Sequence, residues 1–539
     1  MAAHGEAYEL RSTGKDISVT ADRNPSPQSE SGATSKQETL TNRQHEGLSN
    51  STRIRRLFSE AQLFAFALTF MSTWVGMNTN IFFALYQGGP QTFAWGVLIV
   101  YIGAITQAAS IAEMSSTLPI AGAQYHWTHH LAPRRIRRFA TWMQGWFTWF
   151  GWVSLECGIA NITAIMVQQM AMLNNPNYVP KNWHITLIMI AMLIIHGAIN
   201  STSYTFALVP WLELLAGILY VCLFVIFMCV YLVLGTRHST DYTFFHREVS
   251  SGWNNEYVAW NLGLLTCVWS FTGFDGTVHM SEETKKAKQA VPRATLYSIM
   301  LNGALGYCMA ITLITCMGPM ETVLESGFPV ATILQRITGS VAATTALIAG
   351  LFIFSFCLCI ASIASVSRLT WAWSRDGGLP RYLAHVHPRH LVPVRAVWFS
   401  CLVVALLSLL NVGSTAAFGA ITSLSSMALY FSYAIAISSM LFARWTSTRS
   451  GGNEPLELGE WNLGSYGVYI NAYALVHTVY MWVWLPLPQT LPVTAENMNY
   501  AGPIFVAVLL FALGSWFLRA RHSWAGPNPL IVDYIKSQE

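Results

Sequence analysis

Charged side chains are scarce in this chain. Asp, Glu, Lys and Arg make up 10% of its 539 residues, whereas hydrophobic residues make up 53%. Soluble domains of ordinary composition carry about 25% charged residues, so this composition excludes such a domain and indicates an integral membrane protein. The formal net charge of +4 is too small to predict a nucleic-acid partner. The lipid bilayer is therefore the first expected partner.

The sequence also lacks a cysteine pattern that would staple a secreted domain or bind a metal. Its nine cysteines all fall within apolar runs, where cysteine usually acts as a small hydrophobic residue. We therefore expect no metal site and no cofactor.

Twelve apolar segments are long enough to cross a bilayer. A helix needs about 20 apolar residues to cross the ~30 Å hydrocarbon core. The predicted fold class is therefore all-α integral membrane, with twelve transmembrane helices. The predicted spans lie at residues 60–86, 92–117, 139–171, 183–200, 204–234, 256–281, 296–317, 341–372, 396–412, 415–443, 466–487 and 501–519.

Basic residues orient these spans. Most of the Lys and Arg residues near the span ends, such as those at 134–138 and 285–293, fall on loops that share one side with the N-terminus. Cytoplasmic loops retain Lys and Arg, so the N- and C-termini are both predicted to be cytoplasmic. None of the N-x-S/T sequons at Asn50, Asn161 and Asn200 then faces a glycosylating compartment.

Two of the predicted spans are interrupted. The sixth contains Thr272-Gly273-Phe274-Asp275-Gly276, and the first contains a glycine and several polar residues between Ser72 and Asn80. In lipid, unpaired backbone groups survive only where they are buried in protein or line a cavity. Breaks in corresponding positions of the first and sixth spans predict an inverted-repeat transporter with its substrate site at the midplane.

The residues around the two breaks are the candidate substrate-binding residues. Free amides at the start of one half-helix attract an anionic group, and free carbonyls at the end of the other attract a cation. Aromatic rings beside the breaks suit a quaternary or primary ammonium. The candidates are Ser72, Thr73, Trp74, Gly76, Asn78, Phe271, Thr272, Gly273, Phe274 and Asp275.

Three buried carboxyl groups are candidates for coupling transport to protons. An ionisable side chain in mid-span costs roughly 2.5–3.5 kcal/mol on insertion scales and defaults to a functional role. Asp275 is expected to contact the substrate or a proton, with capping of the second half-helix as the alternative. Glu156 and Glu213 are the other two candidates, the alternative being neutral carboxyls held by hydrogen bonds.

Five motifs together resemble one family. They are "GGP" from Gly88, "IAEMSSTLPIAGAQYHW" from Ile111, "MSEETKKAKQAVPRA" from Met280, "SRLTWAWSRDGGLP" from Ser367 and "PVTAENMNYAGP" from Pro492. In this order they resemble the fungal amino acid/choline/GABA permeases of the amino acid–polyamine–organocation (APC) superfamily. The resemblance implies a proton-driven symporter of the plasma membrane that imports choline, GABA or a related amino acid, with the substrate held between spans one and six.

The resemblance also implies a domain organisation. The expected fold is a five-plus-five inverted repeat of the LeuT-like APC type, followed by two C-terminal helices. Residues 1–50 lack apolar clusters, which predicts a disordered cytoplasmic tail, and its Lys15 and Lys36 are expected to allow contact with a ubiquitin ligase. The parts are residues 51–527 for the transporter domain, 60–234 and 256–443 for its repeats, 466–519 for helices 11 and 12, and 528–539 for a cytoplasmic C-terminal tail.

One stretch departs from the wider superfamily. Bacterial amino acid carriers usually show a Gly-Ser/Ala-Gly run in span one, whose amides grip the α-carboxylate. Here Thr73 to Met77 read TWVGM, so one glycine remains and Trp74 is more similar to the choline branch. Asp275 matches the acidic residue that the family carries in span six.

Charged residues next to spans six and eight are expected to latch the cytoplasmic gate. Glu283 and Lys286 follow span six, and Arg375 and Asp376 follow span eight. The alternative is solvated surface charge, worth less than ~1 kcal/mol per pair.

Two other functions fit parts of the sequence. "HWTHH" from His126 and a second cluster at His385, His387 and His390 are typical of a membrane di-iron oxygenase or desaturase. Such an enzyme needs a third histidine box and has few spans, which argues against it. The other alternative is a nutrient sensor that keeps the carrier fold without transporting.

Overall fold

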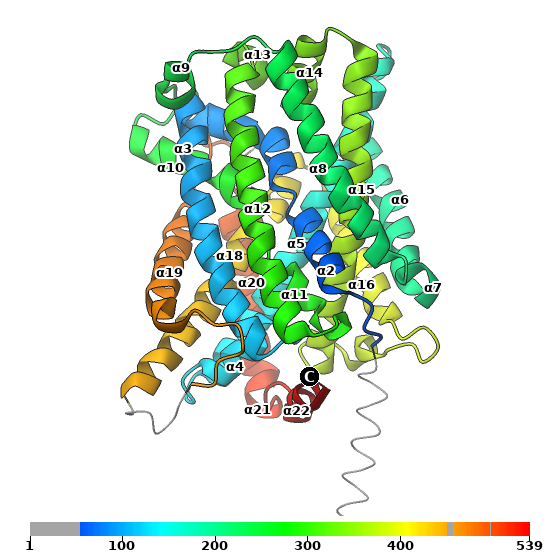
Figure 1. Ribbon diagram of the computed structural model, residues 1–539, viewed down its shortest axis with the longest axis vertical. Coiled ribbons are helices and arrows are strands. Elements are labelled where there is room, and N and C mark those ends of the chain that lie inside the picture. The colour runs from blue at the N-terminus through cyan, green and yellow to red at the C-terminus, as the bar shows by residue number, and fades with distance from the viewer. Residues whose placement is uncertain (1–53, 450–455, 496, 539) are drawn as a thin grey trace, which may run out of the picture. The chain divides into compact units, whose positions relative to one another are not determined.

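The computed structural model describes residues 54–449, 456–495 and 497–538 (Figure 1). The expected N-terminal tail, with Lys15 and Lys36, lies outside the described residues. Within the described ranges the structure is helical, and its one β-bridge joins Phe58 to Thr284.

Nine helical segments of the described chain are long and apolar enough to cross a membrane, which makes this an integral membrane protein. In chain order the helices are α2 Glu60–Met71, α3 Thr73–Thr117, α4 Gln124–Leu131, α5 Arg137–Asn174, α6 Asn182–Ser201, α7 Ser203–Phe206, α8 Val209–Leu234, α9 Thr240–Phe245, α10 Glu256–Ser270, α11 Gly276–His279, η1 Ser281–Glu283, α12 Ala287–Cys316, α13 Met320–Leu324, α14 Pro329–Thr338, α15 Val341–Arg375, η2 Arg381–Ala384, α16 Val394–Ser408, α17 Leu410–Gly413, α18 Thr415–Arg449, η3 Gly464–Tyr466, α19 Gly467–Trp484, α20 Ala501–Ser515, η4 Trp516–Ala520, α21 Arg521–Ser523 and α22 Pro529–Gln538.

Some boundaries differ from those predicted. Helix α12 begins at Ala287 and not at residue 296, because its first turns carry Lys288 and Arg293 and the apolar pattern starts only after them. The predicted spans at 256–281 and 466–487 correspond to the shorter helices α10 and α19, which are not among the nine. Residues 529–538, expected to be a tail, form the amphipathic helix α22.

The break in the first predicted span lies at Ser72. Helix α2 starts with a capping box of Ser59 and Gln62 and ends at Ser72, whose φ of 39° and ψ of 40° are left-handed. Gly76, by contrast, lies in the regular helical part of α3 that precedes a kink at Gly89, whose φ is 71°. Its lack of a side chain serves packing, because a Cβ at Gly76 would lie 2.9 Å from the Oγ of Ser270 in α10.

The break in the sixth predicted span covers Phe271 to Asp275. These residues form turns between α10 and the four-residue helix α11. Gly273 has a φ of 95°, a conformation that L-residues with a side chain rarely adopt. A Cβ there would also lie 2.8 Å from Cδ2 of Leu155 and 3.1 Å from a ring carbon of Phe70.

One asparagine holds the first break together. Nδ2 of Asn302 in α12 donates to the carbonyl of Leu68 at 3.0 Å, and its Oδ1 accepts from the amide of Thr73 at 3.3 Å. The hydroxyl of Tyr220 donates to the same Oδ1 at 2.5 Å. Backbone groups freed by the break are thus paired with buried side chains, which membrane burial requires.

The two breaks are also joined directly. Oγ1 of Thr73 donates to the carbonyl of Ser270 at 3.0 Å, which ties the start of α3 to the end of α10. Helices α9, α13 and α14 lie at one end of the bundle and α4, α21 and α22 at the other (Figure 1). These are called the α9 end and the α4 end below.

Replacing Gly273 with Ala tests the second break. The change should lower the stability of the protein by about 1–3 kcal/mol, because it combines a strained φ with overpacking. The midpoint of thermal unfolding of the purified protein measures the loss. Gly514→Ala is the matched control, since a Cβ there meets nothing within 4 Å; equal shifts in both variants would contradict the packing argument.

Candidate functional site

A small cavity of about 40 Å³ lies between the two breaks. Its polar wall comes from the broken helices and from α5 and α15, and its aromatic wall includes Phe70 and Trp269. None of the residues that line it carries a formal charge. The lining residues with hydroxyl groups or exposed backbone are Ser72, Gly76, Thr79, Thr163, Ser270, Thr272 and Ser355.

Three of the predicted binding residues, Ser72, Gly76 and Thr272, line this cavity. Trp74 does not. Its ring packs against Tyr220 and Phe227 of α8, with ring centroids 5.5 and 5.4 Å apart. Trp74 therefore lies outside the cavity lining, because its side chain on α3 points toward α8.

The other predicted residues also lie outside the lining. Asn78 donates to the carbonyl of Trp74 and accepts from the hydroxyl of Tyr231, so its amide is committed to structure. Phe271 stacks on Tyr101 with centroids 5.8 Å apart. Phe274 packs on Tyr433 at 5.0 Å. Thr73 and Gly273 instead shape the breaks themselves, as described above.

The sequence analysis did not single out several polar and aromatic lining residues, among them Ser270 and Phe70. Ser270 directly precedes the break, in the stretch Trp269-Ser270-Phe271, so a small polar residue at the end of an apolar run was an available signal. No comparable signal marks Phe70. Its position on the cavity depends on the left-handed turn at Ser72. A left-handed turn usually contains a glycine, and none is present at this position, so the sequence gives no sign of the turn.

Asp275 is fully buried and connects four helices. The indole Nε1 of Trp152 in α5 donates to Oδ2 at 3.1 Å, and the hydroxyl of Tyr433 in α18 donates to Oδ1 at 2.5 Å. Gln124 of α4 also donates to Oδ2. Nε2 of His279 in α11 lies 3.7 Å from the same oxygen. Asp275 therefore binds the second break to α4, α5 and α18.

This geometry bears on the two roles considered for Asp275. The residue occupies the N-cap position of α11, yet its side chain makes no capping hydrogen bond. Its carboxylate is instead taken up by side chains from other helices. Asp275 also does not belong to the cavity lining. A substrate inside this cavity would therefore not contact Asp275 in this arrangement.

Glu213 and Glu156 are both fully buried. Oε2 of Glu213 accepts from the hydroxyl of Thr69 in α2 at 2.7 Å, three residues before the break at Ser72. Its other oxygen, Oε1, has no hydrogen-bond partner among the described residues. Glu156 lies against Ser362 of α15, but neither of its oxygens has a well-formed hydrogen bond within the described chain.

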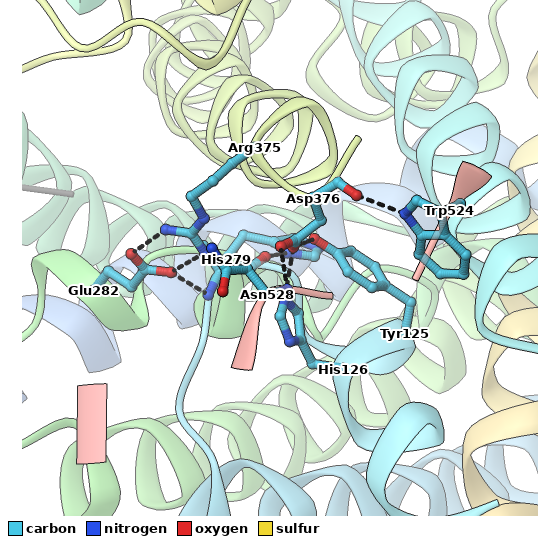
Figure 2. Close-up of polar contacts among 9 residues, drawn as sticks. Tyr125, His126, His279, Glu282, Arg375, Asp376, Trp524 and Asn528 are labelled. Atoms are coloured by element: carbon cyan, nitrogen blue, oxygen red, sulfur yellow. Dashed lines mark hydrogen bonds and ion pairs between the residues drawn. The ribbon is translucent and has the colours of Figure 1, made fainter. Parts of the chain in front are cut away.

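The α4 end is filled by a polar group that we call the α4-end cluster: Tyr125, His126, Glu282, Glu283, Arg368, Arg375 and Asp376. Figure 2 shows Arg375 facing Glu282, with N–O distances of 2.9 and 3.0 Å. In the same view Asp376 accepts from the hydroxyl of Tyr125 at 2.7 Å and pairs with Nε2 of His126 at 2.8 Å. These contacts join α4 and α15 to the loop that follows α11.

The partner of Glu283 is Arg368, not a lysine of its own loop. Nε of Arg368 lies 2.8 Å from Oε1 of Glu283, and both side chains are 1% exposed. Lys286 is exposed and has a left-handed φ of 51°. The expected latch residues thus divide, with Glu283, Arg375 and Asp376 in the α4-end cluster and Lys286 outside it.

Glu282 and Arg368 are cluster members that the sequence analysis did not single out. Arg368 and Arg375 are seven residues apart, or about two turns of helix, and therefore share a face of α15. Two arginines at that spacing near the end of an apolar span were a usable signal. Because the ion pairs of Arg368 and Arg375 are buried, removal of one partner would leave an uncompensated charge inside the protein and strongly destabilise the fold.

Electrostatics keeps Asp376 ionised. Burial raises the pKa of this carboxyl, but the neighbouring His126, Arg375 and Tyr125 act in the opposite direction and hold it below its ordinary value. Because the folded-state pKa is depressed, the stabilisation that Asp376 contributes is present at neutral pH and is lost only as the pH falls through that lowered pKa.

The histidine patterns receive no support as metal boxes. Among the described residues, no group of three or more His, Cys, Asp or Glu side chains is placed to hold a metal ion. The ring of His126 is engaged by Asp376.

Comparison with known proteins identifies the family. The family model described as "Amino acid permease" matches residues 58–510. The chain belongs to the amino acid permease family. This permease is 31% identical to amino-acid permease 2 of Neurospora crassa, over 89% of the chain and 88% of that protein. It is 30% identical to the amino-acid permease BAT1 homolog of Oryza sativa, over 88% and 93% of the two chains.

A further relative is named for another substrate. The permease is 27% identical to the choline transporter of Saccharomyces cerevisiae, over 86% of this chain and 81% of that protein. These comparisons confirm the resemblance to APC-superfamily permeases drawn from the five motifs. The relatives that the chain resembles thus include proteins named as amino-acid permeases and one named as a choline transporter.

The pair of Glu283 and Arg368 can be tested by a double-mutant cycle. Arg368→Gln should destabilise the permease by about 3–5 kcal/mol, because Glu283 is left buried without its partner. Adding Glu283→Gln should recover part of this loss, as read from thermal unfolding of the purified protein.

The matched control is the exposed pair of Arg293 and Glu60, whose closest N–O distance is 3.3 Å. Arg293→Gln should cost less than about 1 kcal/mol. The assignment is refuted if the double variant is as unstable as the sum of the two single variants.

Proposed function

We propose that this permease is a secondary active transporter that imports a small amino compound, such as GABA, another amino acid or choline, by proton symport. The observation that carries the proposal is the cavity between the two breaks, with the α4-end cluster filling the bundle below it. Alternating access would open and close this cavity toward each side of the membrane in turn.

The proposed topology has twelve spans, in two inverted repeats of five followed by two further helices. The broken pairs α2–α3 and α10–α11 would be the first members of the two repeats, which their matching interruptions support. Both termini and the α4 end would be cytoplasmic, since the basic residues at 134–138 and 285–293 lie there. The plasma membrane is the proposed location.

The uncharged lining favours a substrate with no net charge. A zwitterion can place its ammonium toward the carbonyl end of α2 and its carboxylate toward the amide end of α3, because the helix dipoles at Ser72 have these signs. Phe70 and Trp269 add aromatic faces that suit the ammonium. The ammonium of choline could contact these aromatic faces and the carbonyl end of α2. Choline has no carboxylate to place at the amide end of α3.

The cavity must expand to hold such a substrate. Its volume of about 40 Å³ has room for about three water molecules, whereas typical ligand pockets measure about 300–1,000 Å³. We propose that this structure is a contracted state, and that rotation of lining side chains or movement of α2 about Ser72 admits the substrate.

Asp275 is the proposed link between the site and the gate. Its oxygens hold Trp152, Tyr433 and Gln124 on three different helices. A proton on the carboxylate would remove acceptor capacity from these donors and loosen α11 from α4, α5 and α18. Substrate binding next to Thr272 and proton binding at Asp275 would then act on the same turn of backbone.

Glu213 and Glu156 are the secondary coupling candidates. Glu213 is the stronger of these two candidates, because it is hydrogen-bonded to Thr69 of α2. A movement of α2 about Ser72 would change this hydrogen bond. Glu156 of α5 lies against Ser362 of α15, so its contact does not reach either broken helix. A sodium ion is the alternative coupling ion, with Ser362 and Ser365 of α15 as its candidate ligands; the hydroxyl of Ser365 already donates to the carbonyl of Gly276 at 3.1 Å.

The central role of Asp275 predicts the effect of Asp275→Asn. This variant keeps the side-chain shape but cannot exchange a proton, and uptake of labelled substrate should fall to background while surface delivery is retained. Asp275→Ala should also abolish uptake. Asp241→Asn, at an exposed carboxylate of α9, is the control and should transport normally. Wild-type uptake by Asp275→Asn would remove Asp275 from the mechanism.

The substrate and the coupling ion require an uptake panel. Radiolabelled GABA, α-amino acids, choline and polyamines should be supplied to a permease-deficient host, with and without a protonophore. Proton symport predicts that uptake collapses when the protonophore is added. Uptake that persists with the protonophore and depends on sodium would overturn the proton assignment, and the absence of uptake for all compounds would favour a sensor.

A further inference from the structure

A second cavity lies at the α4 end, beside the C-terminal segment. Its volume is about 410 Å³, and it separates residues 519–528 from the stretch that follows α15. Arg381 and Arg519 contribute to opposite walls, and Trp142 and Trp524 are among its aromatic lining residues. The proposed transport cycle uses none of this space.

The charges around this cavity do not balance. Arg375 also borders it but is neutralised by Glu282. The lining carboxylate of Asp376 is taken up by Tyr125 and His126 at Oδ2 and by the amide of Asn528 at Oδ1, 3.3 Å away.

Arg381 and Arg519 remain. Both are exposed, and neither side chain has an ion pair or hydrogen bond within the part of the chain that the structure describes. With Arg375 paired to Glu282, the cavity carries an excess of positive charge, from Arg381 and Arg519 against the single carboxylate of Asp376, whose oxygens already accept hydrogen bonds.

The position of the cavity matches the level of lipid headgroups. Arg519 lies near the end of the apolar segment Ala501–Ser523, which is long enough to span the membrane. Trp142 and Trp524 lie beside it, with ring centroids 5.1 Å apart, and tryptophan is enriched at membrane interfaces. We therefore expect the two arginines at the level of the phosphates of the membrane surface.

We propose that this cavity binds a phosphate monoester, with Arg381 and Arg519 as its ligands. A guanidinium donates two parallel N–H bonds to phosphate oxygens, and a monoester at neutral pH carries nearly two negative charges. The tryptophan rings provide an apolar wall for the group that the phosphate is attached to. The phosphate comes from a lipid headgroup or from a soluble metabolite, which share this chemistry.

Such a ligand would act on the gate. Nε1 of Trp524 donates to the carbonyl of Asp376 at 2.6 Å, so the C-terminal segment already rests on the α4-end cluster (Figure 2). Arg138 of α5 donates to the carbonyl of Trp524. A phosphate that bridges Arg381 and Arg519 joins the two walls of the cavity and stabilises the closed α4 end.

The test uses the full-length purified permease in detergent, without any transported substrate. Dioctanoyl phosphatidic acid is the lipid probe, and glycerol 3-phosphate is the soluble probe with the same phosphate monoester. Dioctanoyl phosphatidylcholine, a zwitterionic phosphodiester with no net charge, is the control. The midpoint of thermal unfolding should rise with the concentration of a monoester probe and not with phosphatidylcholine.

The variant Arg381→Gln/Arg519→Gln should weaken the apparent affinity about tenfold or more, because two charge-assisted contacts are lost. The matched control Arg135→Gln/Arg389→Gln removes two exposed arginines outside the cavity lining and should bind normally. The single variants Arg381→Gln and Arg519→Gln should each show an intermediate loss, which keeps the test valid if the double variant folds poorly.

The outcomes separate clearly. A shift at lower concentration with phosphatidic acid than with glycerol 3-phosphate assigns the site to a lipid headgroup, and equal shifts assign it to a soluble phosphate. No shift with either monoester, or equal weakening in the cavity and control double variants, overturns the proposal. Because binding is read without uptake, failure of the transport assay leaves this result unaffected.

Discussion

The structure depends on one constraint: a backbone broken inside the membrane must find partners in protein. At Ser72 the partner is Asn302, which serves both sides of the break with one amide group and is itself held by Tyr220. At Phe271 to Asp275 the backbone turns tightly enough that Gly273 needs a left-handed φ. The cavity exists because these two breaks face each other, joined by the bond from Thr73 to Ser270.

The second break also connects the cavity to the α4 end. Thr272 lines the cavity, while Asp275, three residues later, is held by donors from α4, α5 and α18. The loop after α11 then supplies Glu282 and Glu283 to arginines of α15. About a dozen residues of one chain segment thus connect Thr272 at the cavity with the buried ion pairs of Glu282 and Glu283. Buried pairs of this kind favour discrete arrangements, because an intermediate position leaves charges unpaired.

Family membership bears on the class of substrate, whereas the cavity lining bears on the charge of the substrate. Relatives are named as amino-acid permeases and as a choline transporter, and these names motivate the proposed substrate class of small amino compounds. The uncharged cavity lining adds a preference that the names do not contain. The motif from Ser367 supplies part of the cavity next to Trp524, but Arg381 and Arg519 line one cavity only because the C-terminal segment folds against the end of α15.

The sequence by itself determined the membrane class, the family, the positions of most helices and the approximate places of both breaks, because hydrophobic length and interrupting residues are local properties. It did not determine where side chains point. Only the tertiary structure turned Trp74 toward α8, paired Glu283 with Arg368 instead of leaving it near Lys286, and set Asp275 behind the cavity among three other helices. The physical reason is that each of these contacts joins residues far apart in the chain, and a rotation of one helix by a single position exchanges a cavity-facing side chain for a packed one.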